Sequence, residues 1–214
     1  MSGVHQGQPV RAAGAPVGRA RVAMVLLHGR GATAEGILAL AAALETPEVA
    51  YVAPQAAENS WYPHSFLAPI PSNEPGISSG LLAITELLSV VESAGVPRER
   101  TLLLGFSQGA CLALEYAARH ASRYGGVVGL SGGLIGPEGT PREYTGGLAG
   151  TPVFLGCSDV DVHIPAARVR LSGQVMHRLG GQVTLELYPG MGHLVNGDEL
   201  SAVRAMLAAV AEAA

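Results

Sequence analysis

Thr101-Leu-Leu-Leu-Gly-Phe-Ser-Gln-Gly-Ala-Cys-Leu-Ala-Leu-Glu-Tyr-Ala-Ala-Arg-His120 is the stretch on which the organisation of the chain depends. Its first four residues form a short, mostly apolar run, which is typical of a strand buried on both faces. The residues after Ser107 are good helix formers without proline, and they predict a helix. Between the two lies Gly105-Phe-Ser-Gln-Gly109, a Gly-x-Ser-x-Gly pattern that lifts a serine hydroxyl clear of the carboxyl edge of a sheet. Ser107 is therefore a candidate nucleophile.

A second match to the same pattern occurs at Gly129-Leu-Ser-Gly-Gly133. It also follows a strand-like run, at residues 126–130. The next residues, Gly-Gly-Leu-Ile-Gly-Pro-Glu-Gly-Thr-Pro, cannot begin a helix. Because a nucleophilic serine of this kind needs a strand, a turn and a helix in succession, the context favours Ser107 over Ser131.

Composition restricts the classes of function. All 13 basic residues are arginines, so a lysine Schiff base and a Walker phosphate loop are excluded. The net charge is −4 and no basic cluster is present, which argues against nucleic acid or an anionic membrane as a partner.

Length and targeting signals suggest a simple organisation. We expect one domain over residues 1–214, with residues 1–9 loosely attached. No signal peptide is evident and no apolar run reaches the length of a membrane span, so we expect a cytoplasmic protein without stable membrane association. Cys111 and Cys157 lie on different predicted elements and fit reduced thiols. The sequence does not decide whether the protein forms a homodimer.

Apolar segments alternate between strand-like and helix-like patterns along the chain. We predict an edge strand within residues 10–20; central strands at 21–28, 49–53, 101–104, 127–130, 152–156 and 183–188; helices at 34–44, 77–94, 108–119, 165–179 and 198–213; and long irregular stretches at 54–75 and 131–150. Such alternation indicates an α/β fold with a mostly parallel central sheet and helices on both faces. Reactive groups should then gather at the carboxyl ends of the strands.

A serine nucleophile needs a base, and His193 is the best candidate among seven histidines. It follows the last predicted strand directly, in Tyr188-Pro-Gly-Met-Gly-His193. His5 lies in the N-terminal segment that we expect to be loose. His28 is expected to pack under the glycine turn that follows it.

The acid is one of only three aspartates. We interpret Asp198 as the N-cap of the last helix. Asp159 and Asp161 share the loop after the strand at 152–156, and either could orient the ring of His193. The order serine, aspartate, histidine is that of α/β-hydrolases. An alternative interpretation is a metal site made by Asp159, Asp161 and His163.

The chain resembles the carboxylesterase/phospholipase family of α/β-hydrolases, the group that includes acyl-protein thioesterases. The resemblance rests on five stretches over nearly the whole chain: Leu27-His-Gly-Arg-Gly, Ala53-Pro-Gln, Gly105-Phe-Ser-Gln-Gly, Leu130-Ser-Gly-Gly and Gly192-His193. It implies an α/β-hydrolase fold without a substantial lid domain. In the acid loop the chain departs from the family pattern, because Leu155 replaces a histidine and two residues are added before Ile164-Pro165. The match at the end of this loop favours Asp161 over Asp159.

The same resemblance implies that the backbone N–H groups of Arg30 and Gln108 form an oxyanion hole. The Arg30 side chain could bind an acidic substrate group, face solvent or pair with a surface carboxylate. Aromatic and apolar residues near the expected triad are candidates for an acyl pocket: Trp61, Tyr62, Phe66, Met191 and Leu194.

These residues predict a serine hydrolase that cleaves small-molecule esters or thioesters of short-to-medium acyl groups through an acyl-enzyme. Nothing in the predicted mechanism requires a metal or an organic cofactor. Two alternatives remain. One is a dienelactone or other lactone hydrolase, a group that typically has a cysteine nucleophile. The other is a ligand-binding protein that keeps the fold without catalysis.

Overall fold

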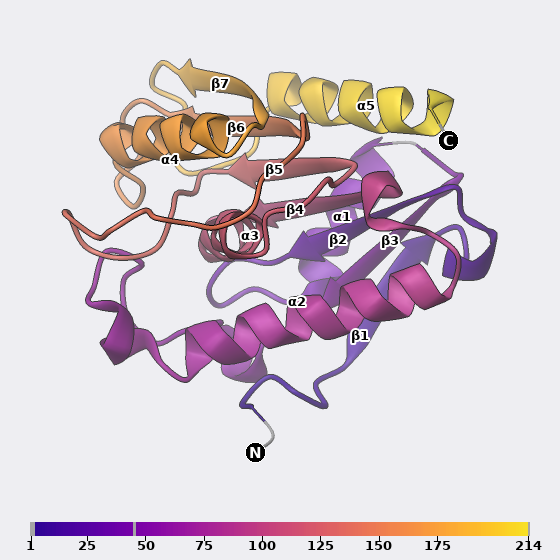
Figure 1. The fold of residues 1–214 in the computed structure, drawn as a ribbon, viewed down its shortest axis with the longest axis horizontal. Coiled ribbons are helices and arrows are strands. Elements are labelled where there is room, and N and C mark those ends of the chain that lie inside the picture. The colour runs from indigo at the N-terminus through magenta and orange to yellow at the C-terminus, as the bar shows by residue number, and fades with distance from the viewer. Residues whose placement is uncertain (1–2, 45, 214) are drawn as a thin grey trace.

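The computed structural model describes residues 3–44 and 46–213, and within these ranges seven strands form one sheet. The strand order is β1-β3-β2-β4-β5-β6-β7 (Figure 1). Only β1 runs antiparallel to its neighbour, β3, and the other pairs are parallel. The strands are β1 Val10–Gly14, β2 Val22–Leu27, β3 Val49–Pro54, β4 Thr101–Phe106, β5 Gly126–Leu130, β6 Pro152–Ser158 and β7 Gln182–Tyr188.

Helices cover both faces of this sheet, which confirms the predicted α/β architecture (Figure 1). The helices α2 (Gly76–Ser93), α3 (Gln108–Arg119) and α4 (Ala166–Arg178) pack on one face, and α1 (Ala34–Leu44) and α5 (Gly197–Glu212) on the other. Each of these strands and α-helices lies within a few residues of its predicted range. No inserted domain interrupts the described part of the chain, as expected for a fold without a lid.

Successive side chains of β2 pack into two different hydrophobic cores, one on each face of the sheet. Val22, Met24 and Leu26 contribute to the core under α1 and α5. The intervening residues, Ala23, Val25 and Leu27, contribute to the core under α2, α3 and α4. Because both faces are covered, all six residues are buried, which explains the continuous apolar run in the sequence.

The helix α2 is 18 residues long and apolar enough to span a membrane by length and composition, contrary to our expectation that no segment would be. Half of it is buried inside the protein. Ile77, Ile84 and Leu88 are fully enclosed in the core under α2, α3 and α4. The apolar composition of α2 is therefore explained by packing against the sheet.

Two expectations about local structure are wrong. The N-terminal segment is not loose at His5, which is 4% exposed, accepts a hydrogen bond from the Ala57 N–H at Nδ1 and lies 2.9 Å from the carbonyl oxygen of Trp61 at Nε2. Residues 1–2 of that segment lie outside the described residues. The N-cap of α5 is Asn196, two residues before Asp198, because the Asn196 side chain accepts from the backbone N–H of Glu199 in a capping box.

Candidate active site

Ser107 lies at the turn between β4 and α3 in a strained backbone conformation. Its φ of 54° and ψ of −118° are rarely adopted by residues other than glycine, and such strain costs about 1–3 kcal/mol. The glycines on either side allow the turn to be this tight. A Cβ on Gly105 would overlap the backbone of Gly109, and a Cβ on Gly109 would overlap the carbonyl group of Leu27. The Gly-x-Ser-x-Gly pattern therefore reflects close backbone packing on both sides of the serine.

Three side chains from different loops form a hydrogen-bonded row. Nε2 of His193 lies 2.8 Å from the Ser107 hydroxyl, and Nδ1 of His193 lies 2.7 Å from the Asp161 carboxylate. The other carboxylate oxygen of Asp161 accepts from the backbone N–H groups of His163 and Ile164, at 2.8 and 3.1 Å. Burial by itself raises the pKa of Asp161, but the hydrogen bonds from His193 and from these two N–H groups outweigh it and lower the pKa below its ordinary value. Asp161 is thus ionised at neutral pH and favours the tautomer with the proton on Nδ1 of His193.

Asp159, the other candidate acid, points away from this row. Its carboxylate accepts a hydrogen bond from the backbone N–H of Gly190, at 2.9 Å, and so closes the turn after β7. Asp159 and Asp161 therefore serve different partners, and with His163 they do not converge on a common point. In residues 3–44 and 46–213, no group of three histidine, cysteine, aspartate or glutamate side chains is placed to hold a metal ion.

Two backbone N–H groups near Ser107 have no acceptor within the described residues. They belong to Arg30, in the turn after β2, and to Gln108, the first residue of α3. The Gly31 N–H of the same turn is occupied, because it donates to the carbonyl oxygen of Asn59 at 2.7 Å. Free N–H donors beside a serine hydroxyl are what an oxyanion of acyl transfer requires.

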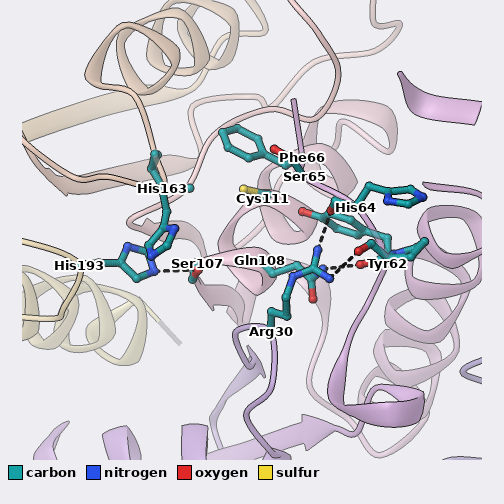
Figure 2. A pocket seen from close by; sticks show the side chains of 12 residues that line it. Arg30, Tyr62, His64, Ser65, Phe66, Ser107, Gln108, Cys111, His163 and His193 are labelled. Carbon is teal, nitrogen blue, oxygen red and sulfur yellow. Dashed lines mark hydrogen bonds between the residues drawn. The ribbon is translucent and has the colours of Figure 1, made fainter. Parts of the chain in front are cut away.

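A cavity of about 560 Å³ opens above Ser107 (Figure 2). Its walls come from the turn at residue 30, the loop at 62–66, the start of α3 at 107, 108 and 111, and the loops at 163–164 and 193. Two of the aromatic residues expected near an acyl pocket, Tyr62 and Phe66, line this cavity. Cys111 also lines the cavity and was not predicted to do so, although it lies in the first turn of α3, four residues after Ser107.

The remaining predicted substrate-binding residues lie elsewhere, and these predictions are not supported by their positions. Trp61 is fully buried, and its ring N–H donates to the carbonyl oxygen of His28 at 2.9 Å. The sulfur of Met191 accepts from the side-chain amide of Asn196, which begins α5. Leu194 is 48% exposed and does not line the cavity.

The loop that carries Tyr62 is clamped by a side-chain amide of α3. Gln108 accepts from the backbone N–H of Trp61 at 2.9 Å and donates to the carbonyl oxygen of Tyr62 at 2.8 Å. Asn73 closes the same loop from its far end by accepting from the His64 N–H and donating to the Ser65 carbonyl oxygen. These two amides were not predicted, and they fix one wall of the cavity through the backbone.

The Arg30 side chain strengthens the same wall. Its guanidinium donates to the carbonyl oxygens of Pro63 and His64, at 2.8 and 2.6 Å, and to the Ser60 hydroxyl (Figure 2). It also lies 5.9 Å from the ring centre of Tyr62. Arg30 therefore lines the cavity without pairing with a surface carboxylate, which differs from one of the expected arrangements.

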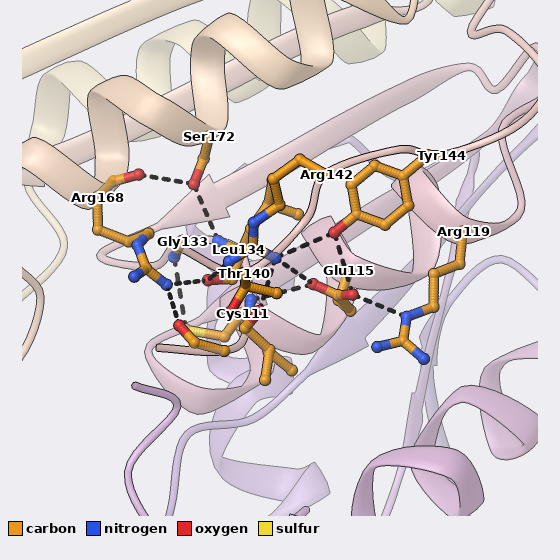
Figure 3. A network of polar contacts seen from close by, with 12 residues as sticks. Cys111, Glu115, Arg119, Gly133, Leu134, Thr140, Arg142, Tyr144, Arg168 and Ser172 are labelled. Carbon is orange, nitrogen blue, oxygen red and sulfur yellow. Dashed lines mark hydrogen bonds and ion pairs between the residues drawn. The ribbon is translucent and has the colours of Figure 1, made fainter. Parts of the chain in front are cut away.

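A buried polar network lies behind the part of the cavity wall that Phe66 contributes (Figure 3). The Glu115 carboxylate, on α3, accepts from the Ile135 N–H at 3.0 Å and from Arg119 at 2.7 Å. Arg168, on α4, donates to the carbonyl oxygen of Gly136, whose N–H in turn donates to the carbonyl oxygen of Phe66. The network thus connects α3 and α4 to the backbone of a residue that lines the cavity.

The competing nucleophiles are poorly suited to the role. Burial raises the pKa of the Cys111 thiol to about 12, so that it is protonated at neutral pH. Ser131 is fully buried, and its hydroxyl has no hydrogen-bond partner in the described part of the protein. As its sequence context predicted, no helix follows Ser131 before β6, a stretch that the structure describes completely.

Comparison with known proteins identifies the family of this chain. A sequence model of the Phospholipase/Carboxylesterase family matches residues 11–211. The crystal structure of a phospholipase/carboxylesterase from Dyadobacter fermentans is 40% identical to this chain, with a TM-score of 0.91, covering 97% of this chain and 100% of the other. The crystal structure of esterase PE8 is 25% identical, with a TM-score of 0.76 over 95% of this chain and 98% of the other.

Curated relatives of this chain are acyl-protein thioesterases. Acyl-protein thioesterase 1 of Gibberella zeae is 33% identical over 123 residues, which make up 53% of this chain and 49% of the relative. The matched part therefore spans about half of that relative's length. Acyl-protein thioesterase 1 of Saccharomyces cerevisiae is 28% identical over 206 residues, 85% of this chain and 89% of the relative. With its fold, its serine turn and a family match over nearly its whole length, the chain belongs to the phospholipase/carboxylesterase family of α/β-hydrolases.

Proposed function

We propose that the protein hydrolyses carboxylic esters or thioesters of short-to-medium acyl groups, with Ser107 as nucleophile, His193 as general base and acid, and Asp161 as the residue that orients His193. The observation that carries this proposal is the continuous hydrogen-bonded row from Asp161 through His193 to Ser107 at the mouth of the cavity. Such a row is the arrangement that makes a serine hydroxyl nucleophilic.

Acylation is the first half of the proposed reaction. His193 takes the Ser107 proton at Nε2 while Oγ forms a bond to the substrate carbonyl carbon. The negative charge that develops on the carbonyl oxygen is stabilised by the N–H groups of Arg30 and Gln108. As the intermediate collapses, the bond to the leaving oxygen or sulfur breaks, and His193 transfers its proton to the leaving group.

Deacylation repeats these steps with water. His193 removes a proton from the water, the hydroxide oxygen bonds to the acyl carbon, and the bond to Ser107 Oγ breaks as the serine recovers its proton. The ionised Asp161 stabilises the protonated His193 ring in both halves. The size of the cavity, about 560 Å³, and its mixed polar and aromatic walls support short-to-medium acyl groups.

The test is hydrolysis of p-nitrophenyl esters and of matching acyl thioesters over a range of chain lengths, with labelling by an active-site fluorophosphonate. We expect Ser107→Ala to abolish both turnover and labelling while the protein stays folded. A wild-type protein that neither turns over any chain length nor takes up the label would favour a ligand-binding protein. Hydrolysis of a lactone in preference to every open-chain ester would favour the lactone hydrolase alternative.

A further inference from the structure

The guanidinium of Arg30 is a cation at the cavity wall whose charge is not neutralised. Its hydrogen bonds go to three neutral oxygens, those of Ser60, Pro63 and His64. A guanidinium has five N–H donors, so two remain available to a ligand. Within residues 3–44 and 46–213, no carboxylate lies within ion-pair distance of Arg30.

The other residues that line the cavity add no negative charge. Three of them are histidines, His64, His163 and His193, and none of the lining residues is an aspartate or a glutamate. This contrasts with the chain as a whole, whose net charge is −4. A cavity with low-dielectric walls concentrates the field of such a cation on what enters it. The cavity is therefore electrostatically suited to a negatively charged group.

The position of Arg30 indicates which part of a substrate it would contact. In Figure 2, Ser107 and Gln108 lie between His193 on one side and Arg30 on the other. Because His193 gives its proton to the leaving group, the leaving group must lie on the His193 side of Ser107. The acyl group then extends past Gln108, toward the guanidinium.

We infer that the preferred substrates are esters or thioesters whose acyl group ends in a carboxylate, that is, monoesters of dicarboxylic acids, and that the Arg30 guanidinium binds this carboxylate. The inference rests on the proposed serine hydrolase function. A planar guanidinium binds a carboxylate through two parallel N–H donors, and such charge-assisted bonds are about twice as strong as neutral ones. Arg30 held by the loop is pre-organised for this contact.

The kinetic test compares p-nitrophenyl monoadipate with its methyl ester, after subtraction of the uncatalysed rates. We expect wild type to have a kcat/KM at least about tenfold higher for the monoanion. Arg30→Gln should lower the ratio of kcat/KM for the monoanion to kcat/KM for the methyl ester about tenfold. This expectation holds even if the substitution also changes both kcat/KM values by a common factor. The matched control is Arg170→Gln, an exposed arginine on α4 outside the cavity, which should leave both rates unchanged. An equal ratio in wild type and Arg30→Gln would overturn the inference.

A binding test separates this inference from the proposed function. Monomethyl adipate is titrated calorimetrically into Ser107→Ala and into Ser107→Ala/Arg30→Gln, with inorganic phosphate in parallel. We expect binding to Ser107→Ala that the second substitution abolishes. Arg30-dependent binding together with an inert wild type would sustain the anion site and overturn the hydrolase. Neutral-ester turnover without Arg30-dependent binding would sustain the hydrolase and overturn the anion site. Tighter binding of phosphate would overturn the assignment to a carboxylate.

Discussion

The Asp161 carboxylate lies 2.7 Å from Nδ1 of His193 and is fully shielded from solvent. Asp159, two residues earlier, bonds to the Gly190 N–H. We therefore expect Asp161→Asn to lower kcat for ester hydrolysis by about three to four orders of magnitude, because an amide favours the wrong tautomer of His193. Asp159→Asn is the matched control and should retain kcat within a few fold. The measurement is kcat for p-nitrophenyl acetate hydrolysis by the two variants. A larger loss of kcat with Asp159→Asn would contradict the assignment of Asp161 as the residue that orients His193.

Gly109 packs so closely against β2 that an added methyl group would overlap the Leu27 carbonyl group. The carbonyl group of Leu27 belongs to the backbone of β2, so it cannot move away from the added methyl group without shifting the strand. We expect Gly109→Ala to lower the free energy of unfolding by more than about 3 kcal/mol, or to prevent folding. Gly197→Ala is the control, since a Cβ there meets nothing within 4 Å and the residue begins α5. It should be neutral or stabilising by up to about 1 kcal/mol. Denaturant unfolding measures both, and equal losses would show that space at Gly109 is not limiting.

The fold and the serine turn could be predicted because their signals are local. Strands buried on both faces leave apolar runs, and the turn at Ser107 leaves a glycine on each side. His193 followed from its place after the last strand. Asp161 was harder, because Asp159 and Asp161 share one loop and their directions depend on its three-dimensional path. Here the resemblance at the end of the loop favoured the aspartate that contacts His193.

The cavity walls could not be predicted in the same way. Trp61 and Tyr62 are adjacent, yet the Trp61 side chain enters the core and only Tyr62 lines the cavity. An irregular loop has no periodicity that would indicate which side chain faces inward. The clamp of Gln108 on this loop joins residues more than forty positions apart through backbone atoms, which carry no sequence signal.

Gln108 therefore offers a test of how the loop is held. Gln108→Met keeps the length of the side chain but leaves the buried Trp61 N–H without its acceptor. The Tyr62 carbonyl oxygen loses one of its two donors and keeps the Ser60 hydroxyl. We expect a loss of about 2 kcal/mol in the free energy of unfolding and a raised KM for esters, because the Tyr62 wall loosens. Gln174→Met, at an exposed position of α4, is the control and should change neither quantity. Urea unfolding and ester kinetics measure the effects, and a KM that stays at the wild-type value would contradict the role of the clamp.

Glu115 tests the network under the cavity. Its carboxylate is almost fully buried and lies 3.6 Å from the guanidinium of Arg142, itself only 7% exposed. Glu115→Gln leaves the Arg142 charge without its partner, and we expect about 3 kcal/mol of lost stability in denaturant unfolding. Glu86→Gln, on the exposed side of α2, removes the same charge at the surface and should cost less than about 0.5 kcal/mol. Similar losses in the two variants would show that the buried pair contributes little.

Glu199 should make stability depend on pH near neutrality. Its carboxylate is fully buried, one oxygen accepts from the Asn196 N–H, and the other has no partner in the described part of the protein. Burial raises the pKa of Glu199 from 4.5 to about 7. Between these values the folded state keeps a proton that the unfolded state releases. The contribution of Glu199 to the free energy of unfolding is therefore fully present below about pH 4.5. It is lost as pH rises from there through 7, the folded-state pKa, and the total loss is up to about 3 kcal/mol.

Glu199→Gln imitates the protonated side chain at every pH, so it should remove this part of the pH dependence. We expect urea unfolding of wild type and variant to agree at about pH 4 and to diverge in favour of the variant as pH rises from 4.5 to 7. Other titrating groups affect both proteins equally, so the difference between the two curves isolates Glu199. Curves that stay parallel from about pH 4.5 to pH 7 would mean that Glu199 is ionised in the folded protein throughout, with its second oxygen solvated.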